Sequence, residues 1–228
     1  MFYQSLAIAV APGIAIALLI YLLDRRDREP VRLLIRSFML GVICTALPLL
    51  VEGLAGRLQW EKGGFLTTAL FAFGIVGLSE ELGKYLVLRY FAFPKAAFNE
   101  PFDGIVYSVM ISMGFATTEN IVYVMQYGIN TGLLRMFTSV PAHAAFAVLM
   151  GYYVGLAKFI PQHRKTLLFT GLFWAVAFHG AYDFFLLLND SIFLVAASLL
   201  CLYIAVRLSI RAIRHHTEIS ERWNKRED

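Results

Sequence analysis

Long apolar runs alternate with short polar segments along almost the whole chain. Seven runs are long enough, or nearly so, to cross a bilayer core, which needs about 20 apolar residues per helix. No polar block between them is long enough to fold separately, so the pattern predicts one all-α, polytopic membrane bundle over residues 1–208 and a charged cytoplasmic tail over 209–228. The seven runs are Phe2–Leu23, Val31–Val51, Gly64–Phe93, Phe102–Tyr127, Leu133–Phe159, Leu167–Leu188 and Ser191–Leu208.

Composition supports a membrane protein and argues against a soluble enzyme. Of the 228 residues, 59% are hydrophobic and 16% charged, whereas soluble domains carry about 25% charged residues. The first apolar run leads directly into Asp24 without a cleavage site, so we expect a retained helix and not a signal peptide. Cys44 and Cys201 both lie inside apolar runs, which predicts buried thiols and no disulfide framework.

The basic residues predict how the chain is oriented. Of the 20 Lys and Arg residues, 17 lie in the tail or in or beside the connections after the first, third and fifth runs. The other three lie on the opposite side of the membrane; they are Arg57, Lys62 and Arg135. Cytoplasmic loops are enriched in Lys and Arg. We therefore expect an extracytoplasmic N-terminus and a cytoplasmic C-terminus, and interpret the net charge of +4 as a topological signal with no nucleic-acid partner.

Ionisable residues inside the predicted spans mark a candidate site, because a charge at a helix centre costs at least about 2.5 to 3.5 kcal/mol to insert. At 1.5 Å per residue, five of the six acidic and histidine positions lie about 18 to 25 Å from the cytoplasmic ends of their spans. Residues that share a depth on four helices can form one site, to which Lys84 adds a positive charge. The six are Glu80, Glu81, Glu119, His143, His179 and Asp183.

Helical spacing indicates which of these side chains pair. Glu80 and Lys84 are i, i+4 and share a face, which is expected to leave Glu81 free. His179 and Asp183 are also i, i+4, so the carboxylate can hold one ring nitrogen and leave the other for chemistry or a metal.

Several other polar or special positions have a structural interpretation. Phe115 and Asn120 are expected to support the site through packing. Pro141 predicts a kink or local break in the fifth span. The remaining histidines are expected to lie on solvated surface; they are His163, His215 and His216.

The residues alone leave three functions open. A glutamate could activate water for peptide hydrolysis with histidine as acid or oxyanion donor, His and Glu could hold a metal, or protons could hop between carboxylates in a transporter. A non-catalytic scaffold that holds a membrane partner is a further alternative. There is no His-Glu-x-x-His or Gly-x-Ser-x-Gly motif.

Four motifs in order resemble the PrsW family of intramembrane proteases, relatives of the CAAX-prenyl-protease and bacteriocin-immunity superfamily. Glu80-Glu81-Leu82-Gly83-Lys84 resembles its Glu-Glu-x-x-Lys signature, and Phe115-Ala116-Thr117-Thr118-Glu119 its Phe-x-x-x-Glu motif. His143-Ala144 and His179-Gly180-Ala181-Tyr182-Asp183 match its third and fourth regions. The resemblance covers nearly the whole chain.

The resemblance implies an intramembrane endopeptidase in the cell membrane. The family implies the first, extracytoplasmic-side cut of a single-span anti-sigma factor in envelope-stress signalling. In this interpretation Glu81, with Glu80 or Glu119, deprotonates a water, while His143 and His179, the latter oriented by Asp183, bind that water, a metal or the oxyanion.

The sequence favours a mechanism without a metal. The histidines come from separate helices, and Lys84 opposes a dication. If zinc is bound, its expected ligands are Glu81, Glu119, His143 and His179.

Overall fold

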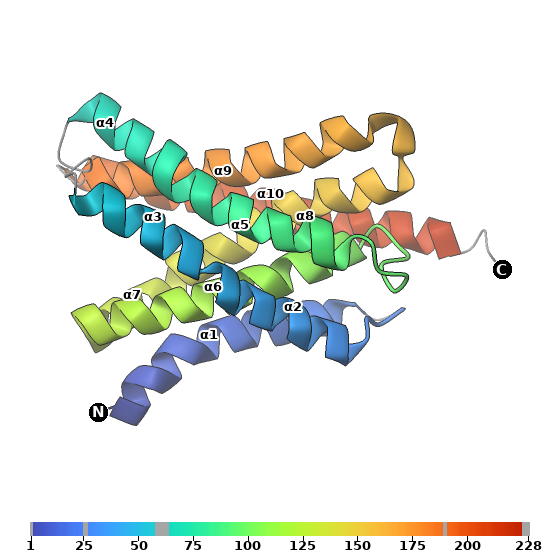
Figure 1. The fold of residues 1–228 in the computed structure, drawn as a ribbon, viewed down its shortest axis with the longest axis horizontal. Coiled ribbons are helices and arrows are strands. Elements are labelled where there is room, and N and C mark those ends of the chain that lie inside the picture. Colours follow the sequence, from blue (N-terminus) through green and yellow to red (C-terminus); the bar gives the residue numbers. More distant parts are fainter. Residues whose placement is uncertain (1, 25–26, 58–63, 189–190, 225–228) are drawn as a thin grey trace.

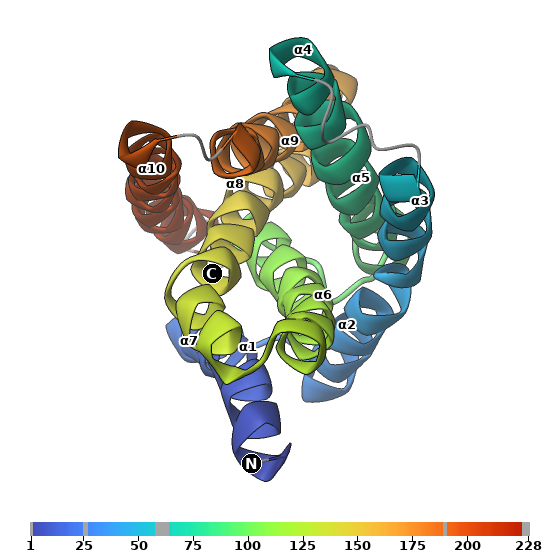
Figure 2. The same cartoon turned by 90° about the vertical axis from the view of Figure 1, so that its left-hand side faces the viewer.

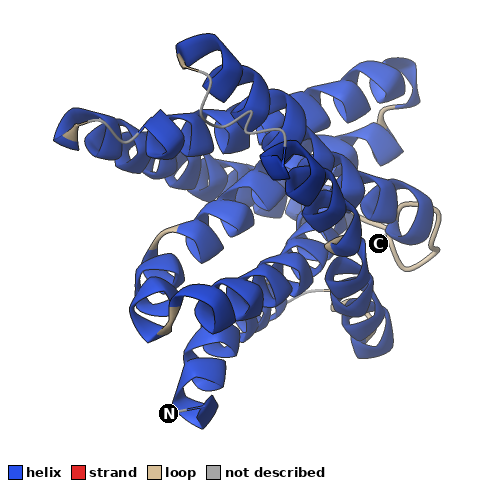
Figure 3. Ribbon diagram, turned by 60° about the vertical axis from the view of Figure 1, so that its left-hand side comes forward, coloured by secondary structure: helices blue, strands red, loops and turns tan. Residues whose placement is uncertain are grey.

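The computed structural model describes residues 2–24, 27–57, 64–188 and 191–224, which fold as helices joined by short turns and loops (Figure 3). Some basic residues that the orientation argument uses lie outside these ranges; they are Arg25, Arg26, Lys62, Lys225 and Arg226.

Within the described residues, seven helical stretches are long and apolar enough to cross a membrane, which confirms the predicted fold class. Helix formation satisfies every backbone hydrogen bond within a span, as a bilayer core requires. The helices are α1 (Phe2–Leu23), α2 (Val31–Cys44), α3 (Ala46–Arg57), α4 (Phe65–Ala69), α5 (Leu78–Val87), α6 (Asp103–Tyr127), α7 (Ile129–Phe137), α8 (Ser139–Phe159), α9 (Arg164–Leu188) and α10 (Ile192–Asn224).

Between α4 and α5 the third span contains a π-helical segment, Leu70–Gly77, and it ends in a second one, Leu88–Ala92. Such wide turns in a helix frequently occur at functional sites. The first of them leads directly into the turn that carries the candidate glutamates.

Two boundaries differ from the sequence prediction in ways that matter for the site. The second span continues past Val51 to Arg57, which brings Glu52 into the bundle. The fifth span breaks at Thr138, between α7 and α8, and not at Pro141. Pro141 lies in the first turn of α8, where a missing N–H costs no helical hydrogen bond.

Helices α6 and α8 form the centre of the bundle, and the other spans surround them (Figure 1, Figure 2). In α6, 83% of the most apolar window is buried, and in the α7–α8 span 72%, against at most 33% in the others. The outer spans therefore leave much of their apolar surface facing lipid, as expected for a polytopic protein.

Glycines allow α2 to cross α6 at close range. A Cβ atom at Gly41 would collide with the carbonyl oxygen of Ile111, and one at Gly114 with that of Phe38. Small residues at helix crossings drive association in lipid through van der Waals packing. The resulting contact fixes α6, and with it Glu119, relative to the second span.

The bundle has two ends, which we name after residues in their connections. Helices α6 and α7 turn at Gly128, where φ is +89°, and α1 begins at this Gly128 end (Figure 1). The opposite Pro101 end holds residues 27–30, the connection between the third span and α6, and the end of α10 (Figure 1).

A buried polar cluster holds the connection after α1 against α6 at the Pro101 end. Tyr107 donates a short hydrogen bond to Glu29, and the Glu29 backbone N–H donates to Asp24 Oδ2 at 3.1 Å. Burial raises the pKa of the Glu29 carboxyl to about 7, although the Tyr107 bond opposes the shift.

One of the three histidines that were expected to be solvated is buried. His216 is 0% exposed and its ring lies 4.3 Å from that of Tyr152, centroid to centroid. The expectation was wrong because α10 continues without a break beyond Leu208 and packs its His216 face on α8 near Gly155. His163 and His215 are exposed as expected.

Candidate active site

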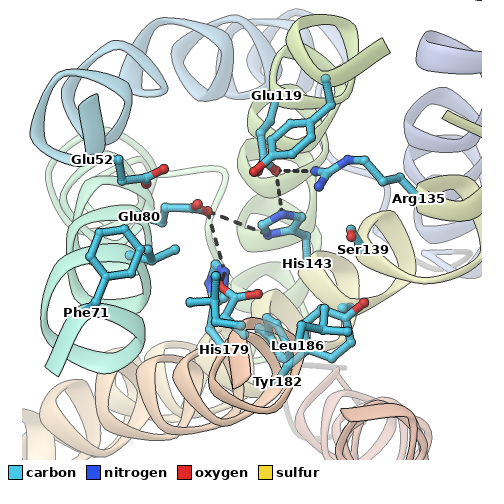
Figure 4. Close-up of a pocket in the computed structure, with 16 residues that line it drawn as sticks. Glu52, Phe71, Glu80, Glu119, Arg135, Ser139, His143, His179, Tyr182 and Leu186 are labelled. Atoms are coloured by element: carbon cyan, nitrogen blue, oxygen red, sulfur yellow. Dashed lines mark hydrogen bonds and ion pairs between the residues drawn. The ribbon is translucent and has the colours of Figure 1, made fainter. Parts of the chain in front are cut away.

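Four buried ionisable side chains meet between α5, α8 and α9. Glu80 and Glu81 come from α5, His143 from α8 and His179 from α9, and one ligand atom from each lies within 4.8 Å of the others. All four residues are at most 4% exposed. Glu119 of α6 joins them through His143 (Figure 4). The shared depth that the sequence predicted therefore corresponds to one cluster.

Lys84 lies at the centre of this cluster. Its Nζ donates to Glu81 Oε1 at 2.7 Å and to Glu80 Oε2 at 3.1 Å, and it lies 3.1 Å from His143 Nδ1. The Phe115 ring covers the ammonium, 4.0 Å from Nζ to the ring centroid. The expectation that Lys84 would leave Glu81 free was wrong, because i, i+3 and i, i+4 spacing brings both carboxylates within its reach.

The contacts of His143 define its tautomer. Because Lys84 Nζ can only donate, His143 Nδ1 must accept, and the ring proton then lies on Nε2. Nε2 is 2.9 Å from Glu119 Oε2, so it donates to that carboxylate. The Ser112 hydroxyl donates to the His143 carbonyl oxygen at 3.0 Å, which fixes the first turns of α8 against α6.

His179 lies between two carboxylates. Its Nδ1 is 2.8 Å from Glu81 Oε1, and its Nε2 is 3.2 Å from Asp183 Oδ2. The expected i, i+4 contact is thus present, but the second nitrogen is not free. Phe146 stacks on the ring with a centroid distance of 5.2 Å. The imidazole can donate to both carboxylates only in its doubly protonated form.

Arg135 is a site residue that the sequence did not predict, since it was counted only as a charge on the side opposite the tail. Arg135 Nη2 lies 2.7 Å from Glu119 Oε2, and the guanidinium packs on the Tyr123 ring at 3.9 Å from the centroid. Its Nε donates to Asn120 Oδ1 at 3.2 Å, and Asn120 Nδ2 donates to the Ala9 carbonyl oxygen at 3.0 Å. Asn120 is therefore a supporting residue, as expected, and ties α6 to α1 and α7.

A cavity of about 320 Å³ opens beside the cluster (Figure 4). Glu80 lines it, whereas Glu81 lies behind it, held by Lys84 and His179. Glu52 of α3 is a second residue that the sequence analysis missed. The lining residues are Glu52, Phe71, Val76, Glu80, Glu119, Tyr123, Arg135, Ser139, Ala142, His143, Phe146, His179, Tyr182, Asp183, Leu186 and Leu187.

Most of the chain resembles known intramembrane proteases. A sequence model described as "PrsW family intramembrane metalloprotease" matches residues 29–209, which include every residue of the cluster. The chain belongs to the PrsW family. It is 35% identical to Protease PrsW of Geobacillus kaustophilus over 188 residues, which are 82% of each chain. It is also 35% identical to Protease PrsW of Bacillus subtilis over 185 residues, 81% of this chain and 83% of that protein. No solved structure matches the chain.

As a PrsW family member the protein is an intramembrane protease, and the donor set of its cluster fits a metal ion. Two imidazoles and two carboxylates are ligands that zinc accepts, and Glu81 Oε2 is buried without a hydrogen-bond partner. The sequence argued against a metal because the two histidines lie on separate helices. The fold removes this objection, since both histidines reach the same cluster. The group of four contains Glu80, whereas the predicted ligand set has Glu119 at that place; Glu119 contacts the group through His143.

The ion pair between Arg135 and Glu119 predicts that Arg135 supports activity. In the Arg135→Gln variant Glu119 keeps its burial but loses its cation, a change that costs about 3 to 5 kcal/mol in buried pairs. We expect cleavage to fall at least about tenfold, with partial recovery in Arg135→Lys. Steady-state kcat/KM of the two variants measures this. Arg57→Gln, at an exposed position of α3, is the matched control, and equal activity of Arg135→Gln and Arg57→Gln would contradict the prediction.

Proposed function

We propose that this member of the PrsW family cuts a single-span membrane protein, a membrane-spanning anti-sigma factor, on the extracytoplasmic side of the bilayer. The observation that carries the proposal is the position of the Glu–His cluster near the Gly128 end. Glu119 lies eight residues before Tyr127, where α6 ends, which is about 12 Å along a helix. A substrate helix could present a bond at this depth by unwinding only its last turns. Such a cut is the first step of the envelope-stress response that the family resemblance implies.

Glu80 is the best-placed general base for this reaction. Its carboxylate lines the cavity and accepts a hydrogen bond from Lys84. Glu80 would take a proton from water as the water oxygen attacks the scissile carbonyl carbon, and would pass that proton to the leaving nitrogen. Glu81 positions Lys84 and His179 from behind.

His143, His179 and Asp183 lie where the developing oxyanion can be stabilised. His143 and His179 both line the cavity, and their ring centroids are 5.1 Å apart. Each ring carries an N–H that points toward a carboxylate, and donation to the developing oxyanion would share or replace that hydrogen bond. The side chain of Asp183, 22% exposed, orients His179 at the cavity surface.

If a metal ion is bound, Glu80, Glu81, His143 and His179 would hold it, and Glu80 would then be a ligand in place of the free general base. When bound, zinc would polarise the scissile carbonyl and make water a nucleophile at neutral pH. Because Lys84 Nζ lies within 3.1 Å of the carboxylate or imidazole atoms that three of these residues would offer the ion, the ammonium would have to move aside.

The orientation that this function needs places the Gly128 end outside the cell. The described connections at the Pro101 end carry exposed basic residues such as Arg28 and Lys165. At the Gly128 end Arg135 is paired with Glu119, which leaves that end still poorer in free positive charge. The positive-inside rule therefore supports a cytoplasmic C-terminus.

Purified protein incubated with a single-span anti-sigma substrate tests the reaction. We expect cleavage by the unaltered protein and a loss of at least about a hundredfold in Glu80→Gln, because a general base contributes that much. Glu119→Gln and His179→Ala should lose activity similarly while the proteins still insert and accumulate. His163→Ala and His215→Ala are the matched controls. Substrate binding without cleavage, or proton flux in liposomes, would instead support the scaffold or transporter alternative.

Reporter fusions test the orientation. Periplasm-specific reporters should be active after Asp190 and inactive after Asp228, because an odd number of spans places the termini on opposite sides. Activity of the same reporter at both positions would contradict the seven-span arrangement.

Metal dependence has a direct test as well. The donor set predicts that chelation abolishes cleavage and that added zinc restores it, with about one zinc per active chain by elemental analysis. Full activity after exhaustive chelation would contradict a catalytic metal and would favour the glutamate mechanism, in which Lys84 alone neutralises the adjacent carboxylates.

A further inference from the structure

Glu52 is an acidic residue of the cavity without an assigned role. It lies on α3, five residues before that helix ends at Arg57. Its carboxylate reaches into the cavity beside Glu80 (Figure 4). Glu52 Oε1 is buried and has no hydrogen-bond partner. Most buried polar atoms in folded proteins are paired, so an orphaned carboxylate oxygen in a cavity indicates a missing partner.

The charges of the cavity wall define what that partner must be. Glu119 is paired with Arg135 and Asp183 with His179. Glu80 forms an ion pair with Lys84, which does not line the cavity. In the described part of the chain no cation lies within ion-pair distance of Glu52. The α3 side of the cavity thus presents a carboxyl group without a cation, and an ammonium or guanidinium group is a complementary ligand.

The position of Glu52 matches what a transmembrane substrate can present. Five residues from the helix end correspond to about 8 Å of depth. A Lys or Arg near the end of a substrate span extends a flexible side chain over such a distance. A buried carboxylate would lower the cost of holding that charge inside the bilayer.

We propose that Glu52 is a specificity-determining residue that binds a Lys or Arg side chain of the substrate next to the scissile bond. The proposal rests on the proposed proteolytic function and adds the chemistry that selects the substrate. Glu52 does not belong to the four residues that can hold a metal, and it therefore acts on substrate recognition and not on the reacting atoms.

The test compares three substrates that are identical except at one position beside the cleavage site. This position holds Lys, Gln or Glu. The unaltered protein should prefer Lys over Gln by about ten- to hundredfold in kcat/KM, the range for a charge-assisted hydrogen bond. Glu52→Gln should lose this preference, so that the ratio of its kcat/KM values for the Lys and Gln substrates falls to about one. Glu52→Lys should prefer the Glu substrate.

Glu218→Gln, at an exposed position of α10 near the Pro101 end, is the matched control and should keep the preference for Lys. An unchanged Lys-to-Gln ratio in Glu52→Gln would overturn the proposal, as would an equal loss of activity on all three substrates by a variant that still inserts and accumulates. No cleavage of any substrate by the unaltered protein would instead contradict the proposed function, so the two failures are distinguishable.

Discussion

The ammonium of Lys84 holds together the polar interior of this bundle. Two glutamates on one turn of a membrane helix would repel each other, and their burial would carry the full free-energy cost of desolvation. Lys84 donates to both carboxylates and also to His143, and Phe115 shields it. The direction of that donation fixes the His143 tautomer, which in turn aims Nε2–H at Glu119. One side chain thereby couples α5, α6 and α8.

Most of the site could be predicted from the sequence because charges inside apolar runs are rare and easy to see. Their common depth and the ordered motifs were enough to predict that Glu80, Glu119, His143 and His179 meet. Which carboxylate faces the cavity could not be predicted, since Glu80 and Glu81 are adjacent in sequence. Their separation depends on the rotation of α5, which follows a π-helical segment.

Arg135 and Glu52 were missed for a shared physical reason. Hydropathy locates a span by its average, so its ends are uncertain by several residues. Ending the second span at Val51 placed Glu52 outside the membrane by one residue. The break at Thr138 separates α7 from α8, and Arg135 of α7 pairs with Glu119, whereas the predicted fifth span begins at Leu133 and continues without this break. The burial of His216 was missed because the charged composition of the tail predicts a solvated segment, whereas α10 continues through it and buries one face.

The central claim is that this cluster hydrolyses a peptide bond inside the membrane near the Gly128 end. Mass spectrometry of the products from a single-span substrate, reconstituted with the purified protein, measures the position of the cut directly. The depth of Glu119, eight residues from the end of α6, predicts a cut within about eight residues of the extracytoplasmic end of the substrate span. A cut in the cytoplasmic half of that span, or in a segment outside the membrane, would contradict the account.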